Sequence, residues 1–91
     1  MRKHLELIIE GRVQGVGFRY FVYNHALRHD IAGYVKNSQD GDVEIICSGE
    51  EKDLSAFMEE IKKGPSFSHV LNVKVKERSE KEDFDNFEIR Y

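Results

Sequence analysis

What the chain has little of excludes several classes of protein. It contains one cysteine and no tryptophan in 91 residues. One cysteine cannot form an internal disulfide or a metal site built from several cysteines. No apolar run approaches the roughly 18 to 20 residues that a helix needs to cross a membrane, and Arg2 and Lys3 are followed by His4-Leu5-Glu6 rather than by the apolar core of a signal peptide. We therefore expect a cytoplasmic protein that does not bind a membrane.

The charge balance limits the partners. The 14 Lys and Arg residues are outnumbered by 17 Asp and Glu residues, which gives a formal net charge of −3. Proteins that bind nucleic acids generally present a basic face, so we expect no nucleic-acid partner. With 40% hydrophobic and 34% charged residues, the composition is typical of a soluble globular chain. We expect a single domain over 1–91, and a small anionic ligand at a local positive site stays compatible with the net charge.

The spacing of apolar residues predicts a defined order of elements. The predicted elements are a half-buried strand before Gly11, a loop over 11–17, a helix from Phe18 to near Asp30, strands over 31–37 and 42–48, a second helix, a strand over 69–78, a loop over 79–85 and a short strand over 87–91. Ser48 with Glu51 resembles a capping box for the second helix, and Gly64-Pro65 is a stop signal. The order β-α-β-β-α-β predicts an α+β, ferredoxin-like two-layer sandwich with both helices on one face of an antiparallel sheet.

The segment Gly11–Arg19, GRVQGVGFR, is the most informative part of the chain. It holds three glycines, ends on a permanent cation and contains no acid. Glycine lets backbone N–H groups approach an oxyanion, and the start of the following helix adds unpaired N–H groups. Arg19 offers a planar fork of donors that fits phosphate geometry. The segment therefore predicts a site for a phosphate or a carboxylate.

Other interpretations of single features are weaker. The glycine pattern lacks the last glycine of a dinucleotide-binding loop, and no Gly-Lys-Ser/Thr follows as in a Walker loop. His25 and His29 have a spacing that can bind a metal, but no motif supplies a third ligand. Cys47 continues the face of Val43 and Ile45, so we expect a buried thiol. We predict no metal site.

Two segments together resemble a known family. GRVQGVGFR resembles the first signature of the acylphosphatases, and GYVKNSQDGDVE, over 33–44, is similar to their second signature. The predicted elements also follow the family's order. One departure is His29-Asp30, where the family usually has Leu-Gly. Because Asp tolerates a left-handed conformation less well than Gly, we expect this joint to be less stable than its counterpart in the family.

The resemblance implies a reaction and the residues that carry it. The reaction is hydrolysis of an acyl phosphate to a carboxylate and inorganic phosphate. Arg19 would bind the phosphoryl oxygens, and Asn37 would orient the attacking water. The backbone N–H groups of the loop would complete the phosphate site, and they belong to Gln14, Gly15, Val16, Gly17, Phe18 and Arg19. The side chain of Gln14 is given no role of its own.

These roles make chemical sense without a cofactor. The leaving group is a carboxylate, whose conjugate acid has a pKa of about 4, so no general acid is needed. Phosphoryl transfer depends mainly on positioning and on stabilising charge. The chain lacks a recognisable nucleophile with its base and a carboxylate cluster for Mg²⁺. We therefore expect a metal-free monomeric hydrolase that takes a small-molecule acyl phosphate.

Two alternatives belong to other functional classes. The chain could be a non-catalytic phosphate-binding or regulatory ferredoxin-like module, because the resemblance extends to an N-terminal module of hydrogenase-maturation carbamoyltransferases. An RNA-recognition domain shares the order of elements but stacks bases on aromatic residues of its central strands. The strand over 42–48 has no aromatic residue, which disfavours RNA binding.

Overall fold

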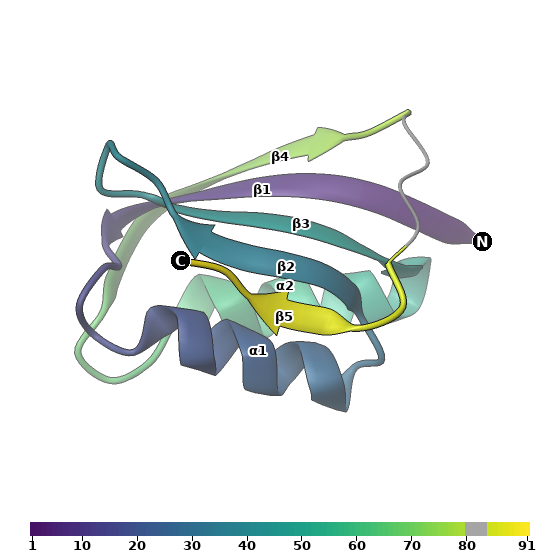
Figure 1. The fold of residues 1–91 in the computed structure, drawn as a ribbon, viewed down its shortest axis with the longest axis horizontal. Helices are drawn as coiled ribbons and strands as arrows, with labels where there is room; N and C mark the ends of the chain where they lie inside the picture. Colours follow the sequence, from purple (N-terminus) through teal and green to yellow (C-terminus); the bar gives the residue numbers. More distant parts are fainter. Residues whose placement is uncertain (80–83) are drawn as a thin grey trace.

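Two helices cover one face of a five-stranded sheet (Figure 1). The structure, a computed structural model, describes residues 1–79 and 84–91. Its elements are β1 (Arg2–Arg12), α1 (Phe18–Arg28), β2 (Ala32–Asn37), β3 (Val43–Glu50), α2 (Glu51–Lys63), β4 (His69–Glu77) and β5 (Phe87–Ile89). The predicted ferredoxin-like sandwich is confirmed.

The sheet has the strand order β4-β1-β3-β2-β5. The pairs β1–β3, β1–β4 and β2–β3 are antiparallel, as predicted, whereas β5 pairs in parallel with β2. The last strand therefore makes the sheet mixed. This pairing brings the end of the chain beside β2 and α1 (Figure 1).

The core lies between the sheet and the helices, where the inward-facing apolar side chains of the strands pack against the apolar stripes of the helices. Its fully buried side chains include Leu7, Ile9, Phe18, Val22, Val35, Ile45, Leu54, Phe57 and Ile61. Cys47 belongs to this core, as predicted. Burial raises the pKa of its thiol to about 12, so the thiol stays protonated and unreactive at neutral pH.

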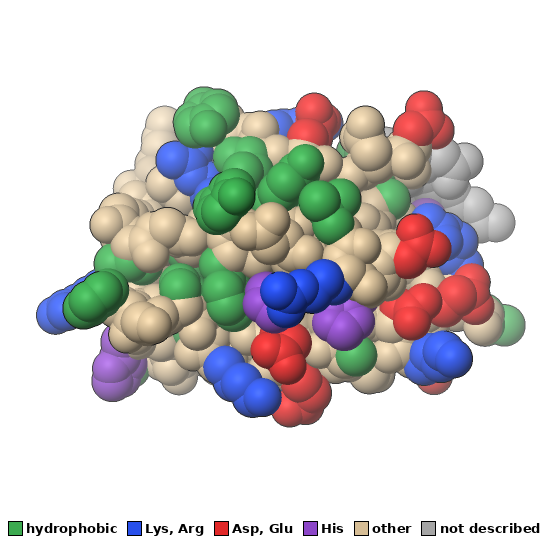
Figure 2. Space-filling model, turned by 90° about the horizontal axis from the view of Figure 1, so that it is seen from below, with side chains coloured by type: hydrophobic (Ala, Val, Ile, Leu, Met, Phe, Trp, Pro, Cys, Tyr) green, Lys and Arg blue, Asp and Glu red, His purple; other side chains and the backbone are tan. Residues whose placement is uncertain are grey.

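The outer face of the helices is charged. Acidic, basic and histidine side chains are interspersed over it (Figure 2). No helix within residues 1–79 and 84–91 combines the length and the apolar character that crossing a bilayer requires.

Several element boundaries differ from the sequence-based prediction. β1 continues through Gly11 to Arg12, with a register shift against β4 between Glu10 and Gly11. The capping box at Ser48 is wrong, because the ladder with β1 continues to Glu50 and keeps the buried Ser48 inside β3. Part of the predicted loop over 79–85 lies outside the described residues.

The helix ends also refine the prediction. α2 ends at Lys63, and Gly64 caps it at the predicted stop signal, with the Gly64 N–H donating to the Glu60 carbonyl at 3.2 Å. α1 ends at Arg28, slightly before the predicted Asp30. Asp30 takes φ of 57° and is the one non-glycine residue with positive φ in the described chain. The joint after α1 therefore needs the left-handed conformation that a glycine would provide at lower cost.

Candidate active site

Both predicted catalytic side chains line one cavity. The cavity has a volume of about 220 Å³ and is lined by Val13, Gly15, Gly17, Phe18, Arg19, Tyr20, Asn37, Ile89 and Tyr91. Arg19 reaches it from the first turn of α1, and Asn37 reaches it from the last position of β2. Antiparallel folding of β1, β3 and β2 thus brings the two signature segments together.

The loop before α1 leaves its backbone open. Gly15 and Gly17 take φ of 74° and 77°, which a residue with a side chain rarely adopts. Gly17 is the N-cap of α1, no side chain caps the first turn, and no acidic residue lies in that turn. The first N–H groups of α1 therefore keep their partial positive charge for an anion.

Two residues after β5 hold Arg19 in place. Nη1 of Arg19 donates to the Arg90 carbonyl at 3.2 Å, and its guanidinium carbon lies 4.5 Å from the centre of the Tyr91 ring. The Arg90 N–H donates to the Val35 carbonyl at 2.8 Å, which fastens this segment to β2. One face and one donor of Arg19 are thus used for orientation, and its other donors stay available for phosphoryl oxygens.

Asn37 stands at the mouth of the β2–β3 hairpin. It pairs with Val43 across the hairpin and is partly buried. Within the described residues its side-chain amide has no hydrogen-bond partner. The amide is therefore free to donate to or accept from a water molecule in the cavity.

The remaining predicted residues occupy different positions. Phe18 is fully buried in the core and also borders the cavity. Val16 packs against the core, and neither Val16 nor Gln14 lines the cavity. The side chain of Gln14 instead bonds to the β2–β3 hairpin, at Ser38 and Asp42. Sequence reasoning missed this contact and the contacts of Arg19, because neither follows from a local pattern.

Of the described residues that line this cavity, none has an acidic side chain, and Arg19 carries the one charged side chain. Across residues 1–79 and 84–91, no group of three His, Cys, Asp or Glu side chains could hold a metal ion. The rings of His25 and His29 stack with centres 6.5 Å apart, and burial lowers the pKa of His25. The favourable charge in the site is therefore that of Arg19 and the helix amides.

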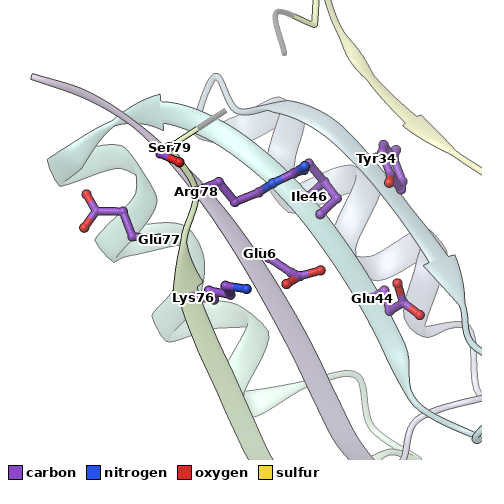
Figure 3. A pocket seen from close by; sticks show the side chains of 8 residues that line it. All are labelled: Glu6, Tyr34, Glu44, Ile46, Lys76, Glu77, Arg78 and Ser79. Carbon is purple, nitrogen blue, oxygen red and sulfur yellow. The ribbon is translucent and has the colours of Figure 1, made fainter. Parts of the chain in front are cut away.

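A second concavity lies on the sheet face that the helices leave open (Figure 3). Glu6 and Glu44 project from its floor, with Lys76 and Arg78 on the β4 side. Within the described part of the chain, Tyr34 is the one aromatic residue that lines it. Carboxylates at the centre of this face repel a phosphate backbone, and a single ring offers little base stacking.

Comparison with known proteins identifies the family. The acylphosphatase family model matches residues 5–89. An acylphosphatase of Bacillus licheniformis is 49% identical over 85 residues, covering 93% of this chain and 94% of that protein. The crystal structure of acylphosphatase from Bacillus subtilis matches with a TM-score of 0.94 and 45% identity, covering 100% of both chains.

A larger protein contains a similar unit. The crystal structure of full-length HypF in its phosphate- and nucleotide-bound form matches with a TM-score of 0.88 and 37% identity, covering 100% of this chain and 12% of that one. The family model and the relatives matched over nearly their whole length agree with the two signature segments that meet at the cavity. The chain belongs to the acylphosphatase family.

Proposed function

We propose that this chain hydrolyses the carboxyl–phosphate anhydride of acyl phosphates, with Arg19 and the loop amides binding the phosphoryl group and Asn37 orienting the water. The observation that carries the proposal is the single cavity that Arg19, Gly15, Gly17 and Asn37 line together. It joins an anion site to a free amide, which are the two parts that hydrolysis of a phosphoryl group requires.

The phosphoryl group is held from one side of the cavity. The backbone N–H groups over 14–19 and the remaining donors of Arg19 surround its equatorial oxygens, which carry charge in the transition state. Tyr91 and the Arg90 carbonyl fix the guanidinium before the substrate arrives. Preorganised donors of this kind stabilise developing charge without having to rearrange.

The water attacks phosphorus while the bond from phosphorus to the acyl oxygen breaks. The electron pair of that bond leaves with the carboxylate, and the proton lost by the water passes to a phosphate oxygen or to solvent. A carboxylic acid has a pKa of about 4, so the leaving group needs no proton. The neutral Asn37 amide holds the water in line for attack, and its effect is therefore on kcat.

The alternative is a non-catalytic phosphate-binding or regulatory module. The match to 12% of the HypF chain shows that this fold also occurs as a small part of a larger protein. A phosphate site without turnover would keep Arg19 and lose nothing when Asn37 changes. The two functions thus differ in what Asn37 does.

The test follows loss of the anhydride from acetyl phosphate and from benzoyl phosphate, with inorganic phosphate as a competing ligand. We expect turnover by the wild-type protein. Asn37→Ala should lower kcat about 100-fold with the affinity for inorganic phosphate within about twofold of wild type, because water placement matters to the reaction alone. Gln39→Ala, on the exposed part of the same hairpin, is the matched control.

The outcomes separate the two functions. Phosphate binding without turnover above the uncatalysed rate would establish the non-catalytic module. Near wild-type turnover by Asn37→Ala would remove its assigned role but leave the activity intact.

We also propose a cytoplasmic monomer that acts on a small-molecule acyl phosphate without a cofactor. The net charge of −3 and the composition typical of a soluble chain support this setting. Size-exclusion chromatography with light scattering should give the mass of one chain, 10.6 kDa.

A chelator tests the metal-free reaction. Activity that survives a chelator would support it, and activity restored only by added Mg²⁺ would contradict it.

A further inference from the structure

The Gln14 side chain joins the two halves of the proposed site. Its Nε2 donates to the Ser38 carbonyl at 2.8 Å and to the Asp42 carbonyl at 2.8 Å. Those carbonyls belong to the two sides of the β2–β3 hairpin, where the Ser38 N–H also donates to the Asp42 carbonyl at 2.9 Å. Both protons of one amide are thus used on one turn. We call this pair of hydrogen bonds the Gln14 bridge.

The chemistry of the amide fixes its orientation. A glutamine amide has two N–H donors on nitrogen and an acceptor oxygen. If the oxygen faced the hairpin, it would meet two carbonyl oxygens, and neither could donate to it. The bridge is partly buried, so competition from water is reduced and the loss of a donor is more costly than at the surface.

The hairpin at the other end of the bridge is held by its own bonds. Ser38 Oγ accepts from the Asp40 N–H at 3.3 Å and from the Asp42 N–H at 3.2 Å. The Gly41 N–H donates to the Ser38 carbonyl at 3.4 Å. Because these hydrogen bonds hold the turn together, a shift of the turn would also shift Asn37, the residue directly before it.

The residues next to the bridge are the ones that line the cavity. Gly15 directly follows Gln14, and Asn37 directly precedes Ser38; both line the cavity, whereas Gln14 does not. The bridge therefore connects the phosphate-binding loop to the segment that carries Asn37. Among the described residues, the two hydrogen bonds of Gln14 are the side-chain hydrogen bonds that join these two segments.

We propose that Gln14 is a positioning residue, whose side chain sets the distance between the phosphate held by the loop and the water held by Asn37. This inference rests on the proposed function, since it assigns how the two parts of that site are aligned. Gln14 acts through Asn37 and need not touch the substrate with its side chain. A misplacement of about 1 Å can cost up to about 100-fold in rate, so a loosened hairpin should lower kcat.

The central experiment is a double-mutant cycle between Gln14 and Asn37. Gln14→Met keeps the length of the side chain, adds no charge and removes both donors. We expect it to lower kcat about tenfold, with the inhibition constant of inorganic phosphate within about twofold of wild type. In an Asn37→Ala background the same change should lower kcat less than twofold, because the water is already misplaced.

Two further variants separate positioning from folding. Gln39→Met makes the same change on the exposed part of the hairpin and should leave kcat unchanged. Gln14→Asn keeps both donors on a shorter side chain and should give a smaller loss of kcat than Gln14→Met. An equal loss of kcat by Gln14→Met with and without Asn37, or no loss in the wild-type background, would overturn the proposal.

A second measurement does not depend on activity. The side-chain amide signals of Asn37 in a ¹H–¹⁵N NMR spectrum should shift in Gln14→Met and stay in place in Gln39→Met. Unchanged Asn37 signals in Gln14→Met would overturn the inference even if the enzyme were slow. If the wild-type protein shows no turnover, the proposed function fails, and these spectra still decide whether Gln14 positions Asn37.

Discussion

The two ends of α1 are built for different purposes. At the first end, Gly17 takes φ of 77°, and no side chain caps the turn. At the other end, Asp30 takes φ of 57°, and the Ile31 N–H donates back to the Ala26 carbonyl at 2.9 Å. The first end keeps its amides open for an anion, whereas the second closes its backbone bonds as a Schellman turn does.

The comparison separates function from stability within one helix. The N-terminal end has a glycine at its left-handed position, no cap and an arginine that projects into the cavity. The C-terminal end has an aspartate at its left-handed position, where the conformation costs roughly 1 to 2 kcal/mol and the negative charge opposes the helix dipole. Changes at the first end should therefore affect activity, and changes at the second should affect unfolding.

The largest expected effect is that of Arg19→Ala. Loss of the cation removes donors that bind both the ground state and the transition state, so kcat/KM should fall by about 100- to 1,000-fold and phosphate affinity should fall with it. Steady-state kinetics with acetyl phosphate measure this directly. Arg28→Ala, in the last turn of the same helix, should retain wild-type kinetics; equal losses in both variants would erase the distinction between the two ends.

A smaller effect, on stability rather than on activity, is expected for Asp30→Gly. Glycine adopts the left-handed conformation without a Cβ penalty and removes a charge at the helix C-terminus, so the free energy of unfolding should rise by about 1 kcal/mol. For a domain of this size the melting temperature should rise by about 4 to 8 °C. Activity should stay unchanged.

The control for that change is Asp85→Gly. Asp85 is exposed and does not have positive φ, so glycine there should lower stability by about 0.5 to 1 kcal/mol through the entropy of the unfolded chain. If thermal unfolding shows Asp30→Gly to be less stable than wild type, the left-handed turn carries no strain and the account of this joint is wrong.

The smallest effect is expected from pH. Among the described residues, no side chain that lines the cavity carries a carboxylate, an imidazole or a thiol, and side chains with those groups are the ones that most often titrate near neutrality. The rate should therefore change little between about pH 6 and pH 8. A steep bell-shaped dependence of kcat/KM would reveal an acid or base that the cavity does not show.

The sequence predicted the parts of the site that follow from local patterns. The alternating strands, the helical stripes and the glycines before Arg19 all lie within short segments. The pairing of Asn37 with Arg19 in one site came from the resemblance to the two acylphosphatase signatures, and both residues line one cavity. The boundary at Ser48 was wrong because pairing with β1 extends β3 and takes priority over the capping preference.

Long-range contacts were beyond the reach of such patterns. The Arg90 carbonyl and the Tyr91 ring meet Arg19 only once β5 has paired in parallel with β2. The Gln14 bridge likewise joins segments that are distant in the chain. Periodicity reports which face of an element is buried, but it does not report which side chain meets which carbonyl across the fold.

The most direct test of the proposed reaction is hydrolysis of acetyl phosphate in ¹⁸O-labelled water with a chelator present. Attack by a water held between Asn37 and the phosphate loop places one labelled oxygen in inorganic phosphate and none in acetate. Mass spectrometry of the two products distinguishes these positions. Label in phosphate, lost together with turnover in Asn37→Ala, is the predicted result; label in acetate, or turnover that requires an added metal ion, would contradict it.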